Sequence, residues 1–112
     1  MPLNQRNEVF YTELATEFLN DLIEILYDQD YFGFLDSALN YVTKLKMFTD
    51  QNIHILQHHP APEYFSKYQS GMKYIAYPAN KRTTWYIFFK QSGNRFLIYY
   101  ITNNHFERQF IR

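Results

Sequence analysis

Residues 81–105, KRTTWYIFFKQSGNRFLIYYITNNH, hold the side chains of this chain that are best suited to chemistry on a polyanion. The stretch combines basic residues, many aromatic rings and one histidine, His105. Basic side chains neutralise anions, aromatic rings stack on bases, and an imidazole with an ordinary pKa of about 6.5 exchanges a proton near neutral pH. We therefore expect a surface here that stacks bases or grips a partner peptide.

Charge is divided unevenly along the chain, although its formal net charge is zero. Residues 1–36 carry eight acidic residues against Arg6, whereas residues 67–112 carry eight basic residues against Glu107. A local field steers association even when the net charge is zero. Two interpretations follow: a positive face that attracts polyanions, or a solvated acidic helix face in one half and edge-strand lysines in the other.

Length and composition predict one globular domain over residues 1–112. The chain is 46% hydrophobic and 21% aromatic, which argues against a disordered or fibrous protein. It has no cysteine, so disulfides and thiolate metal sites are excluded. We see neither a signal peptide nor a run approaching the roughly 20 apolar residues of a membrane span. The expectation is a cytoplasmic protein with no cofactor.

The N-terminal half of the chain predicts a short strand followed by two helices. Residues 7–12, NEVFYT, favour the strand, and from Glu13 to about Gln29 apolar residues recur at helical spacing. Gly33 breaks this pattern, and a second amphipathic helix is predicted from about Asp36 into the 50s. Because the connection is short, the two helices must form an antiparallel hairpin.

The C-terminal half predicts a sheet. Pro60 and Pro62 are expected to stop the second helix, since each lacks a backbone donor, and an ordered loop should follow through Gly71. Three runs rich in β-branched and aromatic residues come next, MKYIAY, TTWYIFFK and RFLIYYIT, with QSGN as a hairpin turn. The sequence therefore predicts an α+β fold, in which an antiparallel helical hairpin packs on a small, mainly antiparallel C-terminal sheet.

The middle run of this sheet separates into two faces, because side chains alternate along a strand. One face is wholly apolar and should contact the helices: Trp85, Ile87 and Phe89. The other mixes charge, hydroxyl groups and rings: Arg82, Thr84, Tyr86, Phe88 and Lys90. Two interpretations of this second face stay open. It is partly exposed as a binding surface, or it is buried under residues 60–71 or a partner protein.

The order of these elements, ending in a histidine, resembles the RelE/ParE family of type II toxin-antitoxin toxins. The strings that carry the resemblance are LNDLIEILYDQDYFGF, HHPAPEYFSKYQSGMKYIAY and TTWYIFFKQSGNRFLIYYITNNH, which together cover most of the chain. The resemblance implies a bacterial toxin bound by a neighbouring antitoxin, whose extended or helical peptide wraps it. It implies a ribosome-dependent mRNA endonuclease if the chain follows the RelE branch, or an inhibitor of DNA gyrase if it follows the ParE branch.

The resemblance also implies a metal-free catalytic set. Matched by position, Lys73 and Arg82 would neutralise phosphate, and His105 would act as general acid or base. Tyr99 and Asn103 share strand parity with His105 if the last strand stays regular, and would stack on or hydrogen-bond a nucleotide. The expected substrate-binding residues are Lys67, Lys81, Tyr86, Tyr99 and Asn103.

The chain departs from the family pattern at three of these places. Thr84 and Asn103 stand where nuclease members often carry arginine, and Phe106 follows His105 where several members place a tyrosine. The predicted site is therefore poorer in positive charge than a typical nuclease of the family. A non-enzymatic toxin and an inactive interaction module of the same fold remain alternatives, as does a structural subunit whose aromatic face only binds its partner.

Other candidates for chemistry are weaker. His54, His58 and His59 allow a metal site in principle, since positions i and i+4 share a helix face, but histidines beside a proline bend without a suitably spaced acid favour surface residues. Glu63 can act as a base near the sheet edge, although a single loop glutamate is usually solvated. The chain has no phosphate-binding glycine loop, nucleophile elbow or zinc-protease motif.

Overall fold

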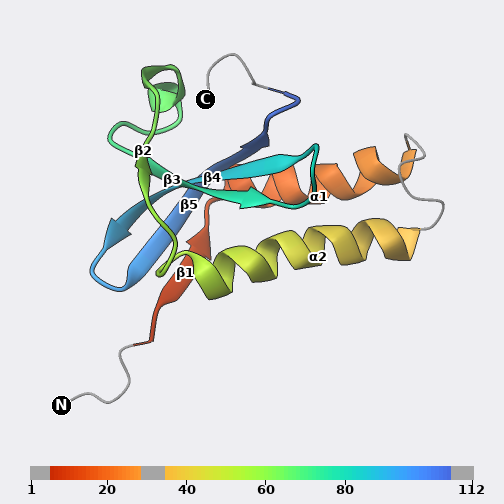
Figure 1. Cartoon of the computed structure of the whole chain (residues 1–112), viewed down its shortest axis with the longest axis horizontal. Helices are drawn as coiled ribbons and strands as arrows, with labels where there is room; N and C mark the ends of the chain where they lie inside the picture. Colours follow the sequence, from red (N-terminus) through yellow and green to blue (C-terminus); the bar gives the residue numbers. More distant parts are fainter. Residues whose placement is uncertain (1–5, 29–34, 107–112) are drawn as a thin grey trace.

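Figure 1 shows the computed structural model of the chain, which describes residues 6–28 and 35–106. Two helices precede most of the sheet. The elements are β1 (Glu8–Tyr11), α1 (Glu13–Asp28), α2 (Leu35–Asn52), β2 (His59–Pro60), the 3-10 helix η1 (Glu63–Lys67), β3 (Lys73–Pro78), β4 (Thr84–Ser92) and β5 (Arg95–Asn103). The predicted break at Gly33 and the last charged residues, from Glu107 onward, lie outside the described residues.

The strands form one sheet in the order β1-β5-β4-β3-β2. The pairs β2·β3, β3·β4 and β4·β5 are antiparallel, whereas β1 runs parallel to β5 with Phe10 beside Leu97. The hairpin between β4 and β5 turns at Gly93, whose φ of 61° favours glycine. The predicted α+β fold with a mainly antiparallel sheet is confirmed.

Both helices pack on one face of the sheet, as predicted. Thr12 caps α1, since its Oγ1 accepts a hydrogen bond from the Ala15 amide at 3.2 Å. Trp85 on β4 lies under the helix pair: its ring centroid is 6.3 Å from those of Phe18 on α1 and Tyr41 on α2, and its Nε1 donates to the Tyr41 hydroxyl at 2.9 Å. Core residues of this layer include Leu19, Leu22, Val42, Leu45, Ile75, Trp85, Ile87, Phe89, Phe96, Ile98 and Ile101.

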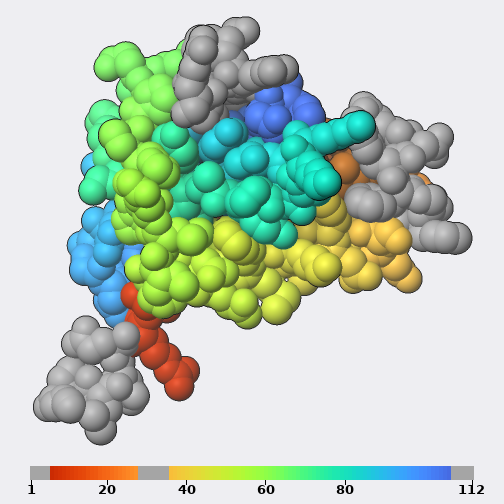
Figure 2. Space-filling view, viewed as in Figure 1, coloured from red at the N-terminus to blue at the C-terminus, as the bar shows by residue number. Residues whose placement is uncertain are grey.

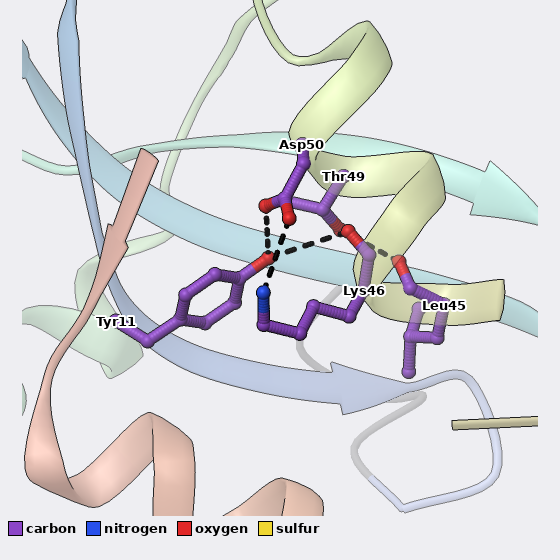
Figure 3. A network of polar contacts seen from close by, with 5 residues as sticks. All are labelled: Tyr11, Leu45, Lys46, Thr49 and Asp50. Atoms are coloured by element: carbon purple, nitrogen blue, oxygen red, sulfur yellow. Dashed lines mark hydrogen bonds and ion pairs between the residues drawn. The ribbon is translucent and has the colours of Figure 1, made fainter. Parts of the chain in front are cut away.

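A polar network joins β1 to α2 (Figure 3). The Tyr11 hydroxyl donates to Asp50 Oδ1 at 2.7 Å, and Lys46 Nζ lies 3.1 Å from Asp50 Oδ2 and 4.8 Å from the centroid of the Tyr11 ring. Thr49 donates to the Leu45 carbonyl at 3.0 Å. Burial and the neighbouring Asp50 carboxylate raise the pKa of Tyr11 far above its ordinary value, so the phenol stays neutral.

The second helix ends in the 50s, as predicted, but not at the prolines. α2 stops at Asn52, well before Pro60, so the prolines are not what ends it. The Asn52 side chain donates to the Phe48 carbonyl at 2.9 Å, and a ring nitrogen of His58 lies 2.7 Å from the Ile53 carbonyl oxygen. The segment after α2 runs along one side of the molecule next to β3 (Figure 2). It contains β2 and η1 within the stretch where an ordered loop was expected.

The second face of the sheet is buried at its centre by η1. Phe65 of η1 stacks on Phe88 with ring centroids 4.4 Å apart, and neither side chain is exposed. Beside them Tyr68 stacks on Tyr100 at 4.0 Å. We call Tyr64, Phe65 and Tyr68 the aromatic cap. Of the two interpretations of this face, burial under residues 60–71 is the correct one for Phe88.

Candidate functional site

Arg82 and His105 come together at one end of the sheet, where the β3–β4 connection meets the end of β5. A ring nitrogen of His105, Nε2, lies 3.0 Å from the Thr83 hydroxyl, and both His105 and Arg82 are exposed. Lys81 is exposed next to them in the chain. We call Lys81, Arg82, Thr83 and His105 the Arg82–His105 corner.

Three asparagines fix the backbone of this corner. Asn80 Oδ1 accepts from the Arg82 and Thr83 amides at 2.8 and 2.9 Å, and Asn104 Nδ2 donates to the Arg82 carbonyl at 3.0 Å. Asn103 Oδ1 accepts from the His105 amide at 2.8 Å. Short polar side chains often bond nearby amides in this way, and the result is a rigid frame that sets where the imidazole lies.

Lys73 does not lie beside Arg82. It is at the start of β3, opposite Phe89, and so belongs to the face that contacts the helices. Pro78 is the residue of β3 at the end of the sheet near Arg82. It is five residues from Lys73, which corresponds to roughly 16 Å along a strand. The three residues expected to form a catalytic set are therefore divided: Arg82 and His105 share a corner, and Lys73 is exposed elsewhere.

Tyr99 and Asn103 do not share a strand face with His105, because Tyr99 is irregular in β5 and His105 lies in the turn after the strand ends at Asn103. Phe88 pairs with Tyr100 and Phe89 pairs with Ile98, so Tyr99 is an extra residue, a β-bulge. After the bulge, Asn103 pairs with Trp85 on the helix side and is only 5% exposed. Its side-chain oxygen is already used by the turn at the end of β5, which leaves it unsuited to a substrate.

The remaining predicted binding residues belong to the aromatic side of the sheet. Tyr86 is half-buried, with its ring centroid 5.6 Å from that of Tyr74. The pKa of Tyr74 is raised, mainly by burial and secondly by the electrostatic effect of the neighbouring Tyr86. Tyr99 is half-buried in the same cluster. Lys67 places Nζ 4.0 Å from the Tyr64 ring centroid, a cation–π contact on the aromatic cap.

Sequence reasoning missed two hydroxyl groups. Thr83 contacts His105 directly. The second is Thr102 of β5, which pairs with Tyr86 of β4 and is 1% exposed. Its Oγ1 is buried without a hydrogen-bond partner among the described residues. Neither threonine stands out in the sequence, because threonine is a common strand residue and its partner depends on the register.

The other histidines and Glu63 show no metal site. His58 packs edge-on against Phe89 with ring centroids 4.8 Å apart, His59 lies 5.1 Å from Tyr74, and His54 and Glu63 are exposed. Within residues 6–28 and 35–106, no group of three or more histidine, aspartate or glutamate side chains is placed to hold a metal ion.

No family model, curated protein or solved structure matched this chain. In the described residues, neither helix is both long and apolar enough to cross a bilayer.

Proposed function

We propose that this chain is a RelE/ParE-like toxin of a type II toxin-antitoxin system, one that cleaves mRNA on the ribosome and is neutralised by a cognate antitoxin. The observation that supports the proposal best is the Arg82–His105 corner, in which an exposed histidine contacts Thr83, and the neighbouring residue in the chain, Arg82, is also exposed. A helical hairpin on one face of a mainly antiparallel sheet is also what the resemblance implies.

The proposed reaction is transfer of a phosphate ester within RNA. The 2′-oxygen attacks the adjacent phosphorus, the bond from phosphorus to the 5′-oxygen breaks, and a 2′,3′-cyclic phosphate and a 5′-hydroxyl result. One proton leaves the 2′-hydroxyl and one reaches the 5′-oxygen. His105 carries out one of these transfers, and Arg82 stabilises the negative charge that builds up on the phosphate oxygens.

Thr83 has a positioning role in this proposal. Its hydroxyl lies 3.0 Å from His105 Nε2 and limits rotation of a ring that is otherwise exposed. Lys73 has no part in the reaction, since it lies on the helix face and far along β3. It therefore provides a matched control: an exposed cation of the same sheet, outside the corner.

The test is to induce the protein alone in a bacterial host and map new mRNA 5′ ends. Codon-phased ends are expected with the wild-type protein and with Lys73→Ala. With Arg82→Ala and with His105→Ala the ends should fall by about a hundredfold or more. Persistence of the ends in both corner variants, at equal soluble expression, would refute the nuclease.

The second candidate is a non-enzymatic toxin of the ParE kind, which acts on a protein such as gyrase. The helical hairpin favours it, because four large apolar side chains on α1 and α2 are 39–49% exposed: Leu14, Ile25, Leu39 and Met47. Growth arrest without new mRNA ends, relieved by Leu39→Ser but not by His105→Ala, would support this candidate over the nuclease.

A further inference from the structure

An apolar hollow lies at the opposite end of the β4–β5 hairpin from His105. Its volume is about 510 Å³, and its wall includes Phe10 of β1, Phe96 and Leu97 of β5, and the cations Lys90 and Arg95. Leu97 pairs with both Phe10 and Lys90, which places these three side chains together on the sheet face away from the helices.

Neither helix nor the aromatic cap covers this hollow. The cap packs on Phe88 and Tyr100, nearer the middle of the sheet. Phe10 is 49% exposed, although an edge strand normally carries polar residues that discourage pairing. An exposed phenylalanine on an edge strand, beside a hollow, is typical of a binding surface.

The outer edge of β1 has backbone amides that can hydrogen-bond a further strand. The Glu8 and Thr12 amides donate to Asn94 and Ile98 of β5, each at 2.9 Å. By the alternation of a strand, the amides of Val9 and Tyr11 face the outer edge of the sheet, where no described strand pairs with β1. A peptide can therefore form main-chain hydrogen bonds at this edge.

The cations beside the hollow select the charge of the peptide. Arg95 Nε lies 3.0 Å from Glu8 Oε1, with both side chains largely exposed, and such a pair contributes little and is easily exchanged. Lys90 is exposed on the other side of Leu97. A second copy of this chain would bring the same two cations and one acid, Glu8, to the contact, so a net positive charge on each side would oppose self-pairing.

We propose that the β1 edge and the adjoining hollow dock an extended segment of a partner protein. The segment adds a strand along β1, places an apolar side chain against Phe10 and Leu97, and presents an acidic side chain to Lys90 and Arg95. This surface goes beyond the proposed nuclease, because it uses none of the residues of the Arg82–His105 corner.

The test is selection from a phage library of random peptides about nine residues long, a typical strand length, against the whole protein. The enriched peptides should alternate apolar and acidic residues. A synthetic enriched peptide, measured by fluorescence polarisation, should bind Phe10→Ser and the Lys90→Glu, Arg95→Glu double variant about tenfold or more weakly than wild type. Lys81→Glu and His105→Ala, at the other end of the sheet, should bind like wild type.

Three outcomes of the peptide measurements would overturn the proposal. These are the absence of enriched peptides, enrichment of basic peptides, and equal affinity for wild type and Phe10→Ser. A concentration-dependent dimer in analytical ultracentrifugation that Phe10→Ser abolishes would also overturn it, because a second copy would then be the occupant. None of these measurements uses RNA or growth, so failure of the docking surface and failure of the nuclease are distinguishable.

Discussion

The Tyr11 hydroxyl links the N-terminal strand to the helical hairpin by a hydrogen bond to Asp50 (Figure 3). Its bond to Asp50 connects residues far apart in the chain, and Lys46 on the next turn of α2 balances the carboxylate. The contact joins the edge strand β1 to the helix layer. At the scale of single residues, this hydroxyl is the clearest target for a stability measurement.

Tyr11→Phe should lower the free energy of unfolding by about 1–2 kcal/mol, because it removes a donor to a charged acceptor and leaves a partly buried carboxylate oxygen unpaired. Urea unfolding followed by Trp85 fluorescence measures the change. Tyr27→Phe is the matched control, since Tyr27 is exposed on α1, and it should leave the midpoint unchanged. Equal midpoints for all three proteins would contradict a stabilising role for the bond.

The raised pKa of Tyr11 predicts a loss of stability in alkali. The unfolded tyrosine ionises near pH 10 while the folded one resists ionisation, so the contribution is complete below about pH 10 and is lost as the pH rises above it. Unfolding free energies measured between neutral pH and pH 11 should fall more steeply for wild type than for Tyr11→Phe. Parallel curves for the two proteins would argue against this assignment.

Among the elements, η1 has the largest effect on the aromatic side of the sheet. Phe65 is fully buried against Phe88, and the stacked pair Tyr68 and Tyr100 closes the cluster beside it. Phe65→Ala should therefore destabilise the protein by about 3–5 kcal/mol, as large deletions in a core do. Thermal unfolding measures the loss, and Phe106→Ala, at an exposed phenylalanine, is expected to change little. A small effect of Phe65→Ala would show that η1 is not part of the core.

The helical hairpin, the three C-terminal strands and the two faces of β4 could be predicted, because each depends on periodicity within one segment. Trp85, Ile87 and Phe89 do face the helices. The prolines were wrongly expected to stop α2, since a side-chain bond from Asn52 to Phe48 and a turn end it before them. The relation of Tyr99 to Asn103 was also missed, because Tyr99 is a bulge in β5, and that of Asn103 to His105 was missed because the strand ends at Asn103 and a turn follows.

Of the three residues predicted to form one site, Arg82 and His105 lie at the same end of the sheet and Lys73 does not. Proximity of the first two follows from pairing of β4 with β5, which the hairpin turn near Gly93 predicts. The position of Lys73 depends on the register of β3 against β4 and on which face of the sheet each β3 residue occupies. No short turn between β3 and β4 determines that register from the sequence. Thr83 was missed for another reason, since its contact with His105 forms in the turns beyond the ends of β4 and β5, which strand pairing alone does not define.

For the whole molecule, the sheet separates two apolar clusters, a larger one under the helices and a smaller aromatic one under η1. The strand β4 contributes to both, with Ile87 and Phe89 on one side and Phe88 on the other. A strand that is central in the sheet and covered on both faces is expected to open last.

Native-state hydrogen exchange should therefore be slowest at the amides of residues 87–89 and fastest in β1 and β2, which are edge strands. Mass spectrometry or NMR measures the order. In Phe65→Ala the protection of β4 should fall further than that of the helices. Protection that is highest in α1 or α2 would show instead that the helix pair is the most stable unit.

The bulge at Tyr99 has a consequence for the length of the chain. Ile98 pairs with Phe89 and Tyr100 pairs with Phe88, so removal of Tyr99 leaves every other pair of the β4–β5 ladder in place. Deletion of this residue should yield a folded protein with a regular strand, whereas deletion of Ile98 would place a tyrosine opposite Phe89, where Ile98 is fully buried, and should lower the melting temperature far more. Tyr99 therefore acts as a one-residue insertion in an otherwise complete strand. A chain without it would keep the register of every other pair between β4 and β5.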